Sequence, residues 1–222
     1  MMNKPNTKEE AGYVRQGSQD EDVKEISQLG VDGKYQWPVR IGSFLLFAVT
    51  VAVNYIVGLE TGRVSDKYRL YVTPPGLFFT IWAVIYTAMA VVNIINLVKN
   101  EWKLPAHIYL AITNVLLIVW ICVFNVGNDA AVYFCALFLI ILVFAGLKFW
   151  IELGKQDNYN WRVYVARNAY AFYLGWIIAA ANINFGMVLV FWWGVSYKAQ
   201  LAIFWVVAPL CAIGVTLLNI KR

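Results

Sequence analysis

The sequence predicts an all-α protein, a polytopic bundle of about six membrane-spanning helices. Of its 222 residues, 61% are hydrophobic and 14% are charged, and the mean hydropathy is +0.61. A soluble domain has about half apolar and about a quarter charged residues. The apolar residues form long uncharged runs, and a bilayer core about 30 Å thick needs roughly 20 such residues per helix. We therefore divide the chain into a polar extramembrane tail, residues 1–38, and a membrane bundle, residues 39–222.

The elements follow in order along the chain. The tail contains no apolar run and matches neither a secretory signal nor an Arg-rich transit peptide. The stretch ETGRVSDKYRLYVT, which begins at Glu60, is predicted to be the loop between the first two spans. Pro74, Pro75 and Gly76 stand at the start of the second span, since proline is tolerated in a first helical turn. The predicted spans are about 40–59, 75–98, 104–125, 130–150, 163–195 and 199–220.

The fifth run is unusually long. As one helix, residues 163–195 would extend roughly 50 Å, which exceeds one bilayer crossing, but two crossings would need about 40 residues. We therefore predict a single span whose first turns lie at the membrane interface.

The basic residues lie at the span ends, which indicates orientation in a bilayer and not nucleic-acid binding. With six spans, eleven Lys and Arg residues fall on one side of the membrane and four on the other. This bias predicts that both termini lie on the positive, cytoplasm-like or matrix-like side. The four residues of the other side are Arg63, Lys67, Arg69 and Lys198.

Several spans carry polar or aromatic residues at helical spacing. Because successive residues turn by about 100°, Phe78, Trp82 and Tyr86 are predicted to share one face, which Asn93 prolongs. Asn114 in span 3 and Asn184 in span 5 belong to similar lines. The first, second, third and fifth spans are thus predicted to enclose a weakly polar interior, with the fourth more peripheral. The other members of these lines are Ser43, Thr50, Asn54, His107, Asn125, Tyr173, Trp176 and Ala180.

Two readings of these lines stay open. They can be interhelical hydrogen bonds and aromatic packing, or the walls of a ligand cavity. His107, the only histidine, lies near a span end and is assigned a capping or interfacial role, because a metal or haem ligand would lack a second histidine.

Most catalytic and transport chemistry has no support in the sequence. The acids outside the tail fall in loops or at span ends, which argues against a proton-coupled transporter. No nucleotide-binding, serine-hydrolase or zinc-protease motif is present, so no enzymatic activity is predicted. Cys122, Cys135 and Cys211 lie within spans without CxxC spacing, and no metal site is predicted.

Two segments carry a family resemblance. PPGLFFTIWAVIY resembles the second-helix entrance of the TspO/MBR family, the tryptophan-rich sensory and translocator proteins. RNAYAFYLGWIIAAANIN, Arg167 to Asn184, is similar to a helix of the longer members. The resemblance implies a five-helix core, here with one helix added, around a pocket for a tetrapyrrole, a sterol or a synthetic ligand. It also implies a mitochondrial location, as in the animal members.

The resemblance gives the candidate ligand-binding set a role. Phe78, Trp82 and Tyr86 would line one wall of the pocket, and Tyr173, Trp176 and Asn184 another. With the polar residues of the predicted interior, the full set is Phe78, Trp82, Tyr86, Asn93, Asn114, Tyr173, Trp176 and Asn184.

The sequence also departs from the family pattern. The family places a tryptophan three residues after an asparagine in its third helix, whereas Asn114 is followed by Leu117 at that offset and by Trp120 later. With the added span and the tail, this departure motivates an alternative: an accessory subunit of a larger membrane complex, for example a respiratory assembly, that has lost the pocket. A homodimer and a small-solute facilitator are further readings.

Overall fold

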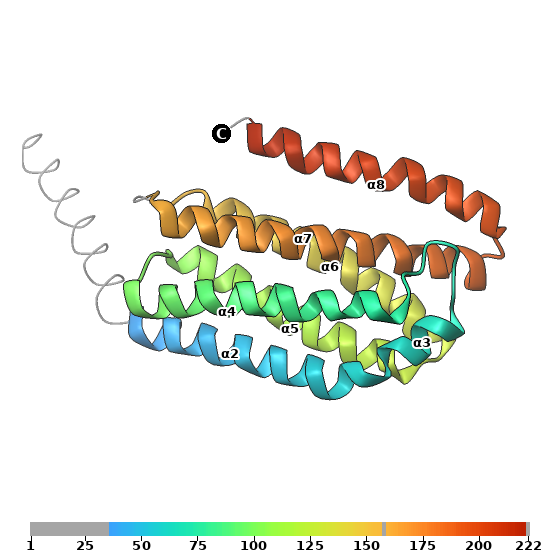
Figure 1. The fold of residues 1–222 in the computed structure, drawn as a ribbon, viewed down its shortest axis with the longest axis horizontal. Coiled ribbons are helices and arrows are strands. Elements are labelled where there is room, and N and C mark those ends of the chain that lie inside the picture. The colour runs from blue at the N-terminus through green and yellow to red at the C-terminus, as the bar shows by residue number, and fades with distance from the viewer. Residues whose placement is uncertain (1–35, 157–158, 221–222) are drawn as a thin grey trace, which may run out of the picture. The chain divides into compact units, whose positions relative to one another are not determined.

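The computed structural model describes residues 36–156 and 159–220, and these residues form helices joined by short connections (Figure 1). The long helices are α2 (Gln36–Val57), α4 (Ile81–Lys99), α5 (Leu104–Val126), α6 (Asp129–Leu153), α7 (Trp161–Met187) and α8 (Tyr197–Ile220). The short ones are η1 (Gly58–Glu60), α3 (Thr61–Lys67), η2 (Gly76–Thr80) and the π-helical η3 (Val188–Trp192). The all-α prediction is confirmed.

The chain divides into two units, Met1–Val39 and Arg40–Arg222. The predictions for the polar tail fall almost entirely outside the described residues. The second unit holds the helix bundle, and everything below concerns this unit.

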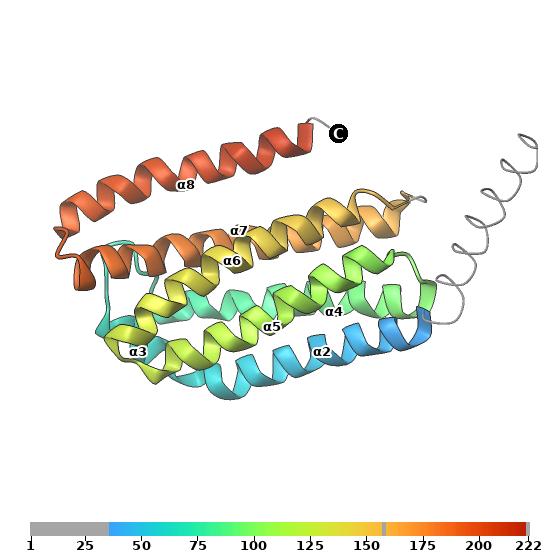
Figure 2. The same ribbon diagram turned by 180° about the vertical axis from the view of Figure 1, so that it is seen from behind.

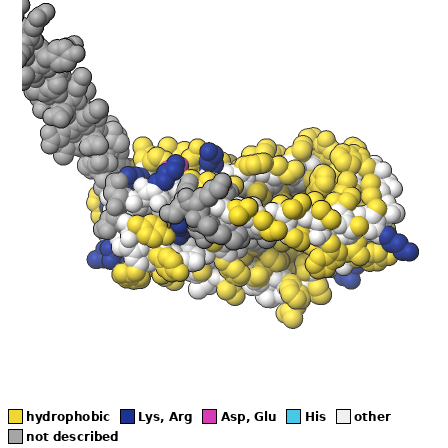
Figure 3. Space-filling view, turned by 90° about the horizontal axis from the view of Figure 1, so that it is seen from above, with side chains coloured by type: hydrophobic (Ala, Val, Ile, Leu, Met, Phe, Trp, Pro, Cys, Tyr) yellow, Lys and Arg dark blue, Asp and Glu magenta, His cyan; other side chains and the backbone are white. Residues whose placement is uncertain are grey.

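The bundle is an integral membrane protein by the length and composition of its helices. Within the described residues, five segments are long and apolar enough to cross a bilayer: Trp37–Lys67, Gly76–Lys99, Leu104–Val126, Asp129–Leu153 and Trp161–Trp192. The helix α8 has 24 residues and follows these five segments, and its apolar stretch Tyr197–Cys211 is shorter than theirs. On the face drawn in Figure 3, Lys and Arg side chains gather towards the two ends and hydrophobic side chains cover the length between them. The predicted bundle of about six helices is confirmed.

The closest packing joins α5 to α6 and α6 to α7, and α4 packs against α7. Figures 1 and 2 show the result, with α5 and α6 on one side of the bundle, α4 and α7 on the other, and α2 along the lower edge of both views. The prediction that the fourth span is peripheral is therefore wrong. Its helix α6 buries small residues such as Ala136 and Gly146, which let neighbouring backbones approach closely. An added Cβ on Gly146 would lie 3.3 Å from Cδ1 of Leu174 on α7.

The helix ends follow ordinary capping rules. The Asn128 side chain accepts a hydrogen bond from the Ala131 N–H at the start of α6, and Asn160 accepts from Arg162 and Val163 at the start of α7. Gly127 ends α5 at φ 69°, a left-handed conformation that favours glycine. These caps fix the short connections on both sides of α6, so α5, α6 and α7 run as neighbours.

The predicted loop between the first two spans is partly helical. The 3₁₀-helix η1 and α3 continue the chain from α2 as far as Lys67. Thr61, Val64 and Ser65 of α3 are buried against the bundle, which explains why this segment is ordered as a helix. The segment between α3 and η2 then leads back to Pro75, the N-cap of η2.

Candidate functional site

A cavity of about 650 Å³ lies between α2, α3 and α4, in the half of the bundle opposite the end that carries most of the basic residues. The last turns of α2 form one wall and η2 with the first turns of α4 form the other. Its size lies within the range of about 300–1,000 Å³ that is typical of small-molecule sites. The lining residues are Val51, Asn54, Tyr55, Gly58, Leu59, Thr61, Gly62, Gly76, Phe79, Thr80, Trp82, Ala83, Tyr86, Thr87 and Ile121.

An aromatic wall stands on the α4 side of this cavity. The rings of Trp82 and Tyr86 stack with centroids 5.1 Å apart, as expected for residues one turn apart on α4. Trp82 also meets Trp176 of α7 edge to face at 6.2 Å, and Tyr173 at 6.5 Å. Aromatic faces held in this way offer a flat, rigid surface to a hydrophobic ligand.

The prediction that Phe78 shares the face of Trp82 and Tyr86 is wrong. Phe78 is 58% exposed and does not line the cavity, whereas Phe79 does. The cause is the 3₁₀ geometry of η2, in which residues three apart, and not four apart, lie above each other. Phe79 is three residues before Trp82 and therefore takes the place that Phe78 would have in an α-helix.

A smaller cavity of about 30 Å³ adjoins the first one towards the bundle interior, and the two share Thr61, Phe79 and Trp82 as lining residues. Trp120 and Phe124 of α5 form its floor. Trp176 and Asn184 of α7 line its far side, so two further members of the predicted set belong to the same site.

Three buried polar atoms on the walls of these cavities have no hydrogen-bond partner among the described residues. They are Oη of Tyr86, Nε1 of Trp120 and Oδ1 of Asn184. Buried polar groups are nearly always satisfied, because an orphaned one costs about 1–3 kcal/mol. These three atoms are enclosed, and they belong to side chains that line the cavities, so a water or a polar ligand group bound there would satisfy them.

The remaining predicted residues lie behind the wall or away from it. Tyr173 is buried and contacts Trp82 but is not a lining residue of either cavity. Asn93 donates to the carbonyl of Met89 and to Oη of Tyr170, both at most 2.8 Å away, so it joins α4 to α7. Asn114 is buried on α5 and lines neither cavity.

The role predicted for His107 is wrong, because His107 is buried and joins three helices. Its Nδ1 lies 2.9 Å from Oγ of Ser43 on α2, and its Nε2 lies 3.5 Å from Nδ2 of Asn96 on α4. The Asn96 side chain in turn accepts from the backbone N–H of Glu101 and Trp102. This network fastens α2 to the bundle at the end opposite the large cavity.

Sequence reasoning also missed several lining residues. The candidate set does not include Phe79, Tyr55 or Thr87. Two of them directly follow a residue that the sequence analysis singled out: Tyr55 follows Asn54, and Thr87 follows Tyr86. Trp120 had a signal: it is six residues after Asn114 and was counted only as a departure from the family pattern. Its position on the cavity wall shows that α5 still supplies a tryptophan to the interior.

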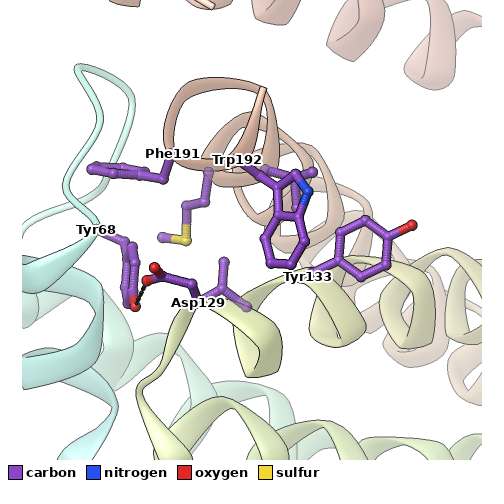
Figure 4. A pocket seen from close by; sticks show the side chains of 8 residues that line it. Tyr68, Asp129, Tyr133, Phe191 and Trp192 are labelled. Carbon is purple, nitrogen blue, oxygen red and sulfur yellow. Dashed lines mark hydrogen bonds between the residues drawn. The ribbon is translucent and has the colours of Figure 1, made fainter. Parts of the chain in front are cut away.

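A second group of polar contacts, which we call the latch, lies at the end of the bundle beside η3 (Figure 4). Oη of Tyr68 donates to Oδ1 of Asp129 at 2.5 Å, and Nζ of Lys67 donates to the carbonyl of Gly127 at 2.7 Å. The Tyr68 ring also meets Phe191 edge to face at 5.3 Å. Burial raises the pKa of the Tyr68 hydroxyl above its ordinary value, and the Asp129 carboxylate raises it further. The latch thus ties the end of α3 to the α5–α6 connection, and the space around it, about 10 Å³, is too small for a ligand.

Comparison with known proteins adds a family assignment. The family model described as TSPO-like protein matches residues 38–222, which is most of the chain. No curated protein and no solved structure matches the sequence.

Proposed function

Because the chain belongs to the TSPO-like protein family, we propose that it is a non-catalytic membrane protein that binds a hydrophobic molecule of the tetrapyrrole or sterol class. The observation that carries this proposal is the 650 Å³ cavity with Trp82 and Tyr86 stacked on its wall. Ring faces suit a rigid, flat ligand, and the unpartnered atoms of Tyr86, Trp120 and Asn184 can fix its orientation.

Binding can be followed by the tryptophan fluorescence of the purified protein in lipid nanodiscs. We expect a porphyrin or a fluorescent sterol to quench it saturably. Trp82→Ala should weaken the affinity at least about tenfold, since it removes a stacking face and its apolar contact area. Trp205→Ala is the matched control, because Trp205 of α8 is 64% exposed and lines neither cavity. Equal affinity in both variants, or no saturable quenching by either probe, would refute the proposal.

The accessory-subunit reading remains a prediction. It assumed a lost pocket, and the open cavity instead favours ligand binding. Its test is the size of the particle extracted in mild detergent: co-purification with a large membrane complex would favour the accessory role, and a monomer or homodimer would oppose it.

We also propose that both termini face the side with most Lys and Arg residues, by the positive-inside rule. A reporter fused to the C-terminus and tested for protease protection would decide the orientation. The only support for a mitochondrial location is the resemblance to the animal members of the TspO/MBR family. Subcellular fractionation would test it.

A further inference from the structure

Arg167 of α7 stacks on Trp150 of α6 at the end of the bundle that carries most of the basic residues, which we call the basic end. Cζ of Arg167 lies 4.0 Å from the centroid of the Trp150 ring, and Nε1 of Trp150 donates to the carbonyl of Arg167 at 3.1 Å. Trp150 is only 4% exposed, so its ring is a fixed plate. Because the face of an indole attracts a cation, the guanidinium is held at the boundary between α6 and α7.

One edge of the Arg167 guanidinium has no partner. Nε and Nη2 are both enclosed, and neither makes a hydrogen bond with the described residues. The N–H groups of these two nitrogens point the same way, which is the geometry that binds two oxygens of a carboxylate or a phosphate side by side. An enclosed donor without a partner is costly. The side chain as a whole is half-buried, so a turn about its outer bonds brings this edge to the surface.

The acids described at the basic end already have partners. One carboxylate oxygen of Glu101 accepts from Nε of Arg162, and the other accepts from Nδ2 of Asn160 at 2.7 Å. Glu152 is paired with Lys155 at 2.6 Å. Among the described residues, no carboxylate therefore pairs with Arg167, and the anion that fits its edge must come from elsewhere.

The depth of Arg167 indicates the class of that anion. Arg167 is about 9 Å along α7 from Trp161, the first residue of the helix. Trp161 and Tyr164 are 63% and 59% exposed, and such residues are typical of the membrane–water interface. Lipid phosphates are the abundant anions at this depth, and basic pockets between membrane helices bind anionic head groups. The described charged residues of the basic end are Arg40, Lys99, Lys103, Lys148, Lys155, Arg162 and Arg167, against Glu101 and Glu152.

We propose that Arg167, held on Trp150, binds the phosphate group of an anionic phospholipid. Two phosphate oxygens accept hydrogen bonds from Nε and Nη2. A zwitterionic lipid carries an additional positive group, which the basic end repels, so anionic lipids are preferred. Neither Arg167 nor Trp150 lines the cavities described above, so this site is distinct from them and does not depend on the proposed function.

The test is native mass spectrometry of the purified chain, delipidated in neutral detergent, with phosphatidylglycerol and phosphatidylcholine of the same acyl chains. We expect phosphatidylglycerol to bind the parent chain at least about fivefold more tightly than phosphatidylcholine. Arg167→Gln should weaken phosphatidylglycerol binding at least about tenfold, because it removes a charge-assisted pair of hydrogen bonds. Arg167→Lys keeps the charge but loses the paired N–H groups, and it should still weaken binding about three- to tenfold.

Lys148→Gln is the matched control. Lys148 is an exposed cation of α6 at the same end, and it points away from Trp150 because two residues of a helix are about 200° apart. The substitution removes the same charge without touching Arg167, so it should change the affinity by less than about twofold. Thermal unfolding in lipid-free detergent shows whether each variant is folded, and Arg167→Lys carries the test if Arg167→Gln is not.

Three outcomes would overturn this inference. Equal weakening by Lys148→Gln and Arg167→Gln would show that the general charge of the basic end holds the lipid. Equal binding of the two lipids to the parent chain would contradict the preference for an anionic lipid. Displacement of phosphatidylglycerol by an equal concentration of inorganic phosphate, which we do not expect, would show that the occupant is a dissolved anion.

Discussion

The two halves of the bundle are built from similarly apolar helices but pack very differently. In the most apolar stretches of α5, α6 and α7, 44% of the residues are buried, against 17% in the first span and 22% in the second. We call α5, α6 and α7 the closed half of the bundle. There, small residues such as Ala136 and Gly146 let neighbouring helices approach each other. We call α2 and α4 the open half. There, the side chains of Thr50 and Asn54 donate hydrogen bonds to backbone carbonyls of α2 itself. Hydrophobicity places a helix in the membrane, and shape decides whether helices close on each other.

The largest effect should follow from deleting side-chain volume in the closed half. Leu139 of α6 is fully buried, so Leu139→Ala should leave a cavity and lower the free energy of unfolding by about 2–5 kcal/mol. Leu45→Ala on α2, where Leu45 is 56% exposed, is the matched control and should change it by less than about 0.5 kcal/mol. Denaturant titration in mixed micelles measures both. Similar losses in the two variants would mean that the halves are equally packed.

Adding volume should separate the halves in the opposite sense. Ala136→Phe in the closed half should cost about 1–3 kcal/mol of stability through overpacking. Ala83→Phe on the wall of the large cavity has open space to fill, so its stability should stay close to that of the parent chain while ligand affinity falls at least about tenfold. Thermal unfolding and fluorescence quenching give the two readouts. If Ala83→Phe destabilises as much as Ala136→Phe, the large cavity is closed in solution.

The smallest effect concerns the latch that ties α3, on the open side, to the α5–α6 connection. Tyr68→Phe removes the hydrogen bond to Asp129 and should lower stability by about 1 kcal/mol near neutral pH. Because the pKa of Tyr68 is raised in the folded protein, its contribution is complete below pH 10 and is lost as the pH rises through the folded-state pKa.

Unfolding curves across this alkaline range provide the check. The difference in stability between the parent chain and Tyr68→Phe should shrink as the tyrosine ionises. A difference that stays constant or grows with pH would show that the Tyr68 hydroxyl does not act as a donor to Asp129.

The sequence was sufficient for the spans, because long uncharged runs have one stable outcome in a bilayer. Trp82, Tyr86, Trp176 and Asn184 line the two adjoining cavities, and their role in ligand binding stays a prediction. The prediction for Phe78 was wrong, because the periodicity of the sequence does not indicate that the helix begins with a 3₁₀ segment after Pro75.

The position of α6 could not be predicted for a different reason. Its lack of a polar stripe suggested lipid on most sides, yet its buried face is marked by small size and not by polarity. The burial of His107 likewise depended on Ser43 and Asn96, which are distant in sequence. Such long-range pairings have no local signal.

The bonds that Thr50 and Asn54 make within α2 recur elsewhere in the bundle, and they bear on how the protein is made. Asn93, Asn125, Asn182 and Asn184 each donate a side-chain N–H to the carbonyl four residues earlier. Each of these side chains thus satisfies part of its hydrogen-bonding capacity before any other helix arrives, which lowers the cost of placing it in hydrocarbon. The helices can therefore leave the insertion machinery one at a time and assemble afterwards, despite the asparagines that they carry.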